Sequence, residues 1–143
     1  MIFRHITKAP GAVSSITLAR EYIQSPLSLY AKLDKENSLL LESAEVDSKD
    51  CLKSLILVDA AIRIECNGQQ VKLVALSNNG MQLLPYLKEK VANCDAVLHD
   101  NTLTLTYQPY QADLDEFSRL KADNAFSALR NCINNIKSTA DNA

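Results

Sequence analysis

The sequence predicts an α+β fold of mostly antiparallel strands and hairpins with flanking helices. Short apolar or alternating segments, which are typical of strands, occur in neighbouring pairs. Turn dipeptides, Asn67-Gly68 and Asp100-Asn101, separate the strands of two such pairs. Segments with apolar residues at three- and four-residue spacing come before, between and after the strands. The order is therefore helix, strands, helix, hairpin, helix, which favours the α+β class.

The first helix is predicted over residues 21–33. Ser25 suits the N-cap, and Pro26 suits the first turn, where a missing N–H leaves no hydrogen bond unmade. Residues 39–41 are three leucines, a run too short for a helix, and they predict a buried strand covered on both faces. A second, longer strand is predicted over residues 55–66, because its later half alternates between apolar and charged side chains.

Two hairpins are predicted. After the Asn67-Gly68 turn, residues 71–76 return antiparallel with Val71 and Leu73 on the core side. Residues 96–99 and 102–107 form the second hairpin, around the Asp100-Asn101 turn.

Two further helices are predicted. Residues 77–80 form a turn, and a helix follows over residues 81–92, with its regular part beginning near Leu84 because Pro85 is tolerated only early in a helix. Asp113 caps a final helix over residues 114–136. That helix shows the spacing of a buried stripe, made of Ala122, Ala125, Phe126, Leu129, Ile133 and Ile136.

Length and composition predict one domain over residues 1–143 with a polar tail at 137–143. The chain is 47% hydrophobic and 22% charged, and its net charge is -2. This balance gives no electrostatic reason to expect nucleic-acid binding, which needs a basic patch or stripe. The sequence contains no apolar run long enough for a membrane span and no signal-peptide pattern, so we expect a cytoplasmic protein.

The cysteines and histidines do not form a recognisable site. The four cysteines have no CxxC spacing and no histidine cluster beside them, so we expect free thiols and no zinc site. His5 and His99 stand far apart, which argues against a Ser-His-Asp arrangement. With three glycines in the chain, a glycine-rich phosphate loop is not expected either.

A polar cluster follows the leucine strand and suggests a binding site. Glu42 and Ser43 come directly after the leucines, and Lys53 precedes the next strand. A carboxylate, a hydroxyl and an ammonium beside an apolar wall suit a zwitterionic ligand with an apolar body. The alternative is a strand-end cap, with Ser43 bonding to the loop backbone and Lys53 paired with a loop acid. Residue types alone favour the cap.

The segment from residue 39 to residue 80 resembles the N-terminal region of anthranilate synthase component I. The resemblance rests on LLLES, DSKD, LKSL, LVD, the IRI strand and the ALS-NG turn. It is weaker in SSITLAREYIQSPLSLYAKL, LDEFSRL and NAFSALRNCIN. The resemblance implies the N-terminal part of that family's fold over nearly the whole chain.

The resemblance also implies a ligand. In that family the LLES segment forms part of the site where L-tryptophan binds and inhibits the enzyme. The matching positions here are Glu42, Ser43 and Lys53, with Ser43 the clearest. The ligand's identity therefore comes from the resemblance, and the residue types are compatible with it.

The family's reaction converts chorismate, with ammonia or glutamine, to anthranilate, the first step of tryptophan biosynthesis. The resemblance implies a glutamine amidotransferase partner (component II) and Mg²⁺ for the full-length enzyme. The family's chorismate and magnesium residues lie beyond the resembling region, so we expect this chain to be inactive alone and to contain no metal or catalytic site. Two alternatives stay open: the N-terminal segment of aminodeoxychorismate synthase component I, and a stand-alone amino-acid-binding module.

Overall fold

The computed structural model describes residues 11–15, 21, 25–33, 36–42, 54–109 and 115–140. The length predicts one domain. Contacts between residues divide the chain into two compact units. The sheet unit comprises Met1–Thr17 and Ala61–Ala143, and the hairpin unit comprises Leu18–Ala60. Helices occur together with antiparallel strands, which confirms the α+β class.

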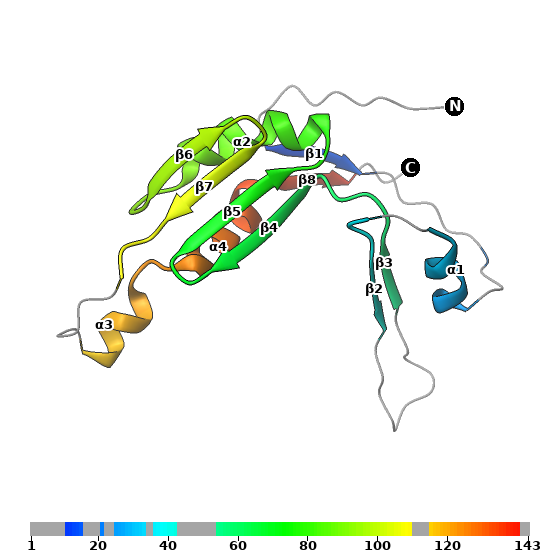
Figure 1. Ribbon diagram of the computed structural model, residues 1–143, viewed down its shortest axis with the longest axis horizontal. Helices are drawn as coiled ribbons and strands as arrows, with labels where there is room; N and C mark the ends of the chain where they lie inside the picture. Colours follow the sequence, from blue (N-terminus) through cyan, green and yellow to red (C-terminus); the bar gives the residue numbers. More distant parts are fainter. Residues whose placement is uncertain are drawn as a thin grey trace. The chain divides into compact units, whose positions relative to one another are not determined.

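A four-stranded antiparallel sheet lies at the centre of the sheet unit (Figure 1). Its strands are β4 (Ile62–Asn67), β5 (Gln70–Ala75), β6 (Asp95–His99) and β7 (Thr102–Thr106), in the order β4-β5-β7-β6. Both predicted hairpins are confirmed, since β4 pairs with β5 and β6 pairs with β7. Gly68 begins the first turn at φ 58°, a left-handed conformation that glycine adopts without strain.

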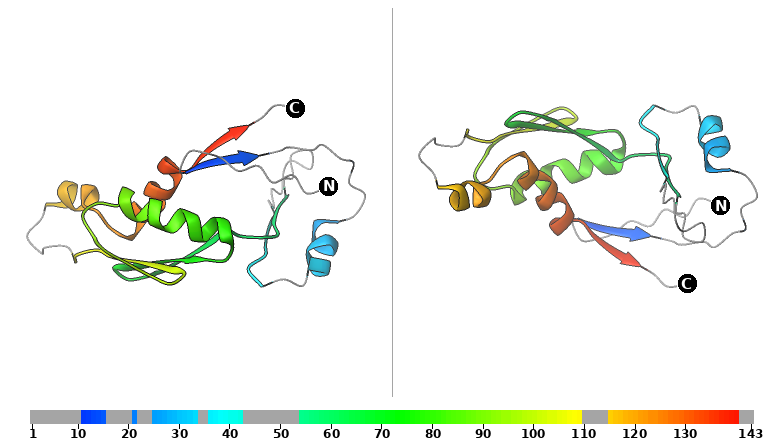
Figure 2. Two further views of the ribbon diagram at one scale, coloured as in Figure 1. Left: turned by 90° about the horizontal axis from the view of Figure 1, so that it is seen from above. Right: turned by 90° about the horizontal axis from the view of Figure 1, so that it is seen from below.

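Two helices cover one face of this sheet. Helix α2 (Asn78–Lys90) contacts β5, β6 and β7, and α4 (Ala125–Asn135) contacts α2 and β5. Figure 2 shows both helices on the same side of the sheet. Within the described ranges, none of the helices has the length and hydropathy needed to cross a bilayer.

The core lies between the helices and the inner face of the sheet. On that face Leu73 lies opposite Leu103, and Val71 lies opposite Leu105. All four side chains are buried, as are Leu84 and Leu87 from α2. The prediction that Val71 and Leu73 face the core is therefore confirmed. Among the described residues, the buried apolar set is Val71, Leu73, Ala75, Leu84, Leu87, Leu103, Leu105, Tyr107 and Ala128.

The single strand predicted over residues 55–66 is wrong. The structure divides it into β3 (Ser54–Leu57) and β4, with a bend between them. The two strands pair with different partners, β3 with β2 (Leu39–Glu42) and β4 with β5. Asp59 is the one charged residue between the apolar residues of β3 and Ile62, so periodicity alone does not reveal the break.

Helix α2 begins earlier than predicted. Residues 77–80, expected as a turn, are the N-cap and first turn of the helix: the Ser77 Oγ accepts a hydrogen bond from the Gly80 N–H at 3.1 Å. Pro85 lies inside the helix, where it cannot donate to the carbonyl of the preceding turn. Pro85 and Met81 are both exposed, so water can reach that carbonyl.

The final helix predicted over residues 114–136 is two helices, α3 (Glu116–Lys121) and α4. Asp113, predicted to cap it, lies outside the described residues, and Asp115 caps α3 by accepting from the Ser118 N–H at 2.9 Å. Asn124 caps α4 in a reciprocal capping box with Ser127. Side chains that bond to nearby backbone compete with helix continuation, which explains the break before α4.

The predicted buried stripe on this helix is wrong in part. Ala125 and Ile136 pack against the core, but Phe126 and Ile133 are exposed. Helix α4 instead turns a face containing Ala128 and Cys132 inward. Small inward residues allow the helix to approach α2 and β5 closely.

A parallel strand pair joins distant parts of the sheet unit and was not predicted. Strand β1 (Ala12–Ser15) pairs with β8 (Lys137–Ala140), which covers most of the predicted polar tail. The Lys137 N–H also donates to the Gly11 carbonyl at 2.9 Å. Gly11 is buried at φ 74°, and a Cβ there would overlap the Tyr86 ring.

The hairpin unit contains helix α1 (Pro26–Leu33) and the antiparallel pair β2–β3. The predicted N-cap is confirmed, because the Ser25 Oγ accepts from the Ser28 N–H at 3.2 Å. The predicted helix start at residue 21 is wrong, since α1 begins at Pro26.

Candidate ligand-binding site

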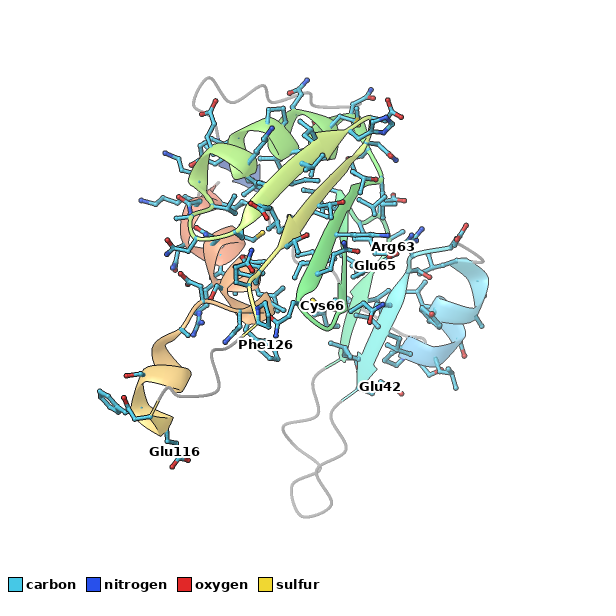
Figure 3. All side chains as sticks on the ribbon, turned by 60° about the vertical axis from the view of Figure 1, so that its left-hand side comes forward. Glu42, Arg63, Glu65, Cys66, Glu116 and Phe126 are labelled. Atoms are coloured by element: carbon cyan, nitrogen blue, oxygen red, sulfur yellow. The ribbon has the colours of Figure 1, made fainter. Side chains whose placement is uncertain are left out.

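One of the predicted site residues, Glu42, lies at one end of the β2–β3 hairpin. Glu42 is the last residue of β2, where Figure 3 labels it. Ser43 and Lys53 lie outside the described residues. Glu42 pairs with Ser54, the first residue of β3. In the sequence, Ser43 follows Glu42 and Lys53 precedes Ser54.

The register of the hairpin assigns its side chains to two faces. Partners across an antiparallel pair share a face, and successive residues alternate. Leu40 and its partner Ile56 therefore share one face with the Glu42–Ser54 pair. The opposite face, called the leucine face, consists of two cross-strand pairs, Leu39–Leu57 and Leu41–Leu55.

Helix α1 covers the face that carries Leu40 and Ile56. It contacts both strands, and the Tyr30 hydroxyl donates to the Ser38 carbonyl just before β2, at 3.4 Å. Leu40 and Ile56 are half-buried, whereas the residues of the leucine face are exposed. The exposed fractions are 45% for Leu39, 53% for Leu41, 63% for Leu55 and 42% for Leu57.

The prediction that residues 39–41 form a strand is confirmed, but the prediction that it is buried on both faces is wrong. A run of three leucines does not distinguish a strand with two covered faces from one that leaves an apolar face open. The open leucine face is therefore the feature of the hairpin that sequence reasoning missed. The register with residues 54–57 is the signal that identifies it.

The described polar groups at the hairpin end are accessible to a ligand. Glu42 and Ser54 are both exposed. In the described part of the chain, neither an ion pair nor a hydrogen bond engages the Glu42 side chain. Its carboxylate can therefore accept hydrogen bonds from a ligand cation at the edge of an apolar surface.

A second candidate lies on the outer face of the four-stranded sheet. A hollow of about 420 Å³ there is lined by side chains that include Arg63, Glu65, Lys72, His99 and Asp100. Its charges are largely matched within the hollow: Arg63 Nε lies 2.8 Å from Glu65 Oε1, and His99 Nδ1 lies 3.1 Å from Asp100 Oδ2. All four of these residues are exposed, as expected for the solvated face of an antiparallel sheet. His5 lies outside the described residues.

Burial favours the protonated form of three titratable groups in or beside the core. Burial raises the pKa of the Tyr107 phenol and of the Cys94 and Cys132 thiols above their ordinary values. Contact with Tyr107 partly offsets this effect on the pKa of Cys94. Among the described residues, no atom meets hydrogen-bond geometry with the Tyr107 hydroxyl. Protonated thiols are poor nucleophiles and poor metal ligands. Among the described residues, His, Cys, Asp and Glu side chains form no group of three or more that can hold a metal ion.

Comparison with known proteins identifies the family. No family model matches the sequence. The chain is similar to anthranilate synthase component 1 of Vibrio parahaemolyticus, with 41% identity over 126 residues, and to that of Vibrio cholerae, with 46% identity over 112 residues. These matches cover 86% and 76% of this chain but 23% and 21% of the two proteins, so the chain spans about a fifth of their length.

A third relative is matched over most of its own length. It is an anthranilate synthase component 1 sequence of Citrobacter freundii, 40% identical over 119 residues, which are 79% of each chain. By this likeness, the chain belongs to the anthranilate synthase component 1 family.

Proposed function

We propose that this chain is the N-terminal regulatory part of anthranilate synthase component I. In this proposal the end of the β2–β3 hairpin contributes to the site where L-tryptophan binds and inhibits the enzyme. The observation that carries the proposal is the exposed Glu42 carboxylate at the end of the β2–β3 hairpin, on the same face as the apolar side chains of Leu40 and Ile56. Membership of the anthranilate synthase component 1 family supports tryptophan as the ligand, because this family catalyses the first step of tryptophan biosynthesis.

Each predicted residue has a defined role in this proposal. The Glu42 carboxylate accepts hydrogen bonds from the ammonium group of tryptophan, and the Lys53 ammonium pairs with its carboxylate. The Ser43 hydroxyl bonds to one of these polar groups. Leu40 and Ile56, which share the face of Glu42, supply apolar surface for the indole ring, as is usual for a pocket that binds an amino acid with a large side chain.

The chemical reaction belongs to the rest of the enzyme in this proposal. The complete enzyme converts chorismate and ammonia or glutamine to anthranilate in the cytoplasm, with a glutamine amidotransferase as partner. The described residues do not fit a Mg²⁺ site, because they contain no cluster of potential metal ligands. Tryptophan acts by coupling, typically ~1–3 kcal/mol between two sites, and so weakens chorismate binding elsewhere in the protein.

The first test replaces Ser43 in a working enzyme. The 143 residues of this chain would be joined to the part of the Vibrio cholerae protein outside the matched segment. Anthranilate formation would be measured against L-tryptophan concentration, with D-tryptophan as the ligand control. We expect Ser43→Phe to abolish inhibition while activity without tryptophan is retained, because the ring fills the pocket. Val97→Phe, at an exposed position of the sheet unit, is the matched control and should leave inhibition intact.

A second variant tests the charge of Glu42. Glu42→Gln keeps the shape of the side chain and removes its negative charge. Hydrogen bonds to charged groups contribute ~1.5–3 kcal/mol, so the half-inhibitory tryptophan concentration should rise about tenfold or more. Unchanged inhibition by tryptophan in both Ser43→Phe and Glu42→Gln would refute the proposed site, even if the joined protein makes anthranilate.

A further inference from the structure

Helix α4 carries large apolar side chains on its exposed side. Phe126 is 69% exposed and Ile133 is 76% exposed. They are seven positions apart, nearly two helical turns, so both lie on one side of the helix. Arg130 lies between them on this side and donates from Nη2 to the Ser127 Oγ at 3.1 Å. We call this surface the Phe126–Ile133 face; Figure 3 labels Phe126 at the start of the helix.

The opposite side of α4 is made of smaller residues. Ala125, Ala128 and Cys132 all belong to or pack against the core. A helix that only completes the core of one unit directs its large apolar residues inward and its polar residues outward. Single exposed apolar residues are ordinary on protein surfaces, but two aligned on a helix that buries small residues indicate a second packing surface.

The sheet is also incompletely covered on its inner side. Ile64 lies opposite Leu73 and Cys66 lies opposite Val71, so both point to the inner face. Ile64 is only half-buried and Cys66 is exposed, although their partners on β5 are fully buried. The sheet unit therefore leaves apolar surface on the same side of the sheet as α4, at the edge strand β4.

The relatives suggest what covers this surface. In the two Vibrio proteins about four-fifths of the polypeptide lies outside the matched segment. We propose that the Phe126–Ile133 face is a docking surface for an apolar helix or sheet face from that part of an anthranilate synthase component 1 polypeptide. This proposal rests on family membership and on the geometry of α4, and it does not depend on tryptophan binding.

The test asks whether the two pieces associate through this face. The tagged 143-residue chain would be co-expressed with the part of the Vibrio cholerae protein outside the matched segment, and the complex would be purified without tryptophan. We expect co-purification with the native chain and a loss of about tenfold or more with the Phe126→Glu/Ile133→Glu variant, since buried interface anchors each contribute above ~1 kcal/mol. Val97→Glu, at an exposed site on the outer face of the sheet, should retain the complex.

Two results of the co-purification would overturn the proposal: no complex with the native chain, or full retention of the complex by the double variant. Because the double variant can be unstable, hydrogen exchange on the native chain is a second measurement. Amides of residues 125–135 should exchange more slowly in the complex, and unchanged exchange would also overturn it. Light scattering of the chain alone tests for a second copy, and a dimer abolished by the double variant would reassign the face to self-association.

Discussion

Two leucine pairs in this protein have the same chemistry and opposite environments. Leu73 and Leu103 lie directly opposite one another in the four-stranded sheet, as Leu41 and Leu55 do in the β2–β3 hairpin. The first pair is buried, whereas the second is more than half exposed. In the sheet unit, α2 supplies Leu84 and Leu87 to the inner face, while α1 covers only the other face of the hairpin. Burial is therefore determined by the element that covers a strand, and an apolar strand does not establish a core by itself.

The largest effect is expected from a substitution that breaks the buried leucine pair. Leu103→Ala should lower the free energy of unfolding by about 2–5 kcal/mol, because it leaves a cavity in a close-packed core. Leu55→Ala, at the equivalent position of the exposed pair, should change it by under about 1 kcal/mol. Urea denaturation followed by circular dichroism measures both variants. Equal losses would mean that the leucine face is covered in solution.

An intermediate effect is expected at Gly80, where the first turn of α2 meets the chain before β4. Alanine normally stabilises a helix by ~1 kcal/mol relative to glycine. Here the added Cβ would overlap the Ala61 carbonyl oxygen, so overpacking prevails and Gly80→Ala should destabilise by about 1–3 kcal/mol.

Asn79→Ala, one residue earlier and exposed, is the control for Gly80→Ala. Hydrogen exchange should show faster opening of β4 and β5 in Gly80→Ala and unchanged exchange in β2 and β3. If both units opened together, the comparison between separate regions would not hold.

The smallest effect concerns pH and again distinguishes the two units. Burial raises the pKa of the Cys94 and Cys132 thiols from 9.0, so the folded sheet unit retains protons that the unfolded chain loses. Above pH 9.0 the unfolded state binds fewer protons, and the free energy of unfolding falls as pH rises. Below that pH both states are protonated and the contribution is constant. Cys132→Ala should reduce the fall of the free energy of unfolding with rising pH, whereas Cys66→Ala, which removes an exposed thiol, should leave it unchanged. An equal fall in the two variants would contradict this account.

Local signals in the sequence predicted the elements that depend on local chemistry. The hairpins around Gly68 and Asp100, the Ser25 cap and the inward positions of Val71 and Leu73 were all predictable from turn residues and alternation. The predictions were wrong where the structure of a segment depends on partners that are distant in the sequence. The strand predicted at residues 55–66 divides because its halves pair with different strands. Helix α4, which contacts α2 and β5, turns Ala128 and Cys132 toward the core and leaves Phe126 and Ile133 exposed.

The candidate site was predicted in part for a similar reason. The position of Glu42 at a strand end follows from its place after the leucines, and the structure agrees. The open leucine face depends on the register with β3 and on which side α1 covers, and neither is encoded in residues 39–43 alone. The roles of Ser43 and Lys53 stay predictions, since both residues lie outside the described ranges.

The pairing of β1 with β8 has a consequence for protein synthesis. Residues 12–15 leave the ribosome about 125 residues before residues 137–140 are made. At ~5–20 residues per second, β1 waits roughly 6–25 s for its partner strand. The two hairpins of the four-stranded sheet are local and can form during that interval. Closure of β1 on β8 is therefore expected after the local hairpins have formed, once residues 137–140 have been made.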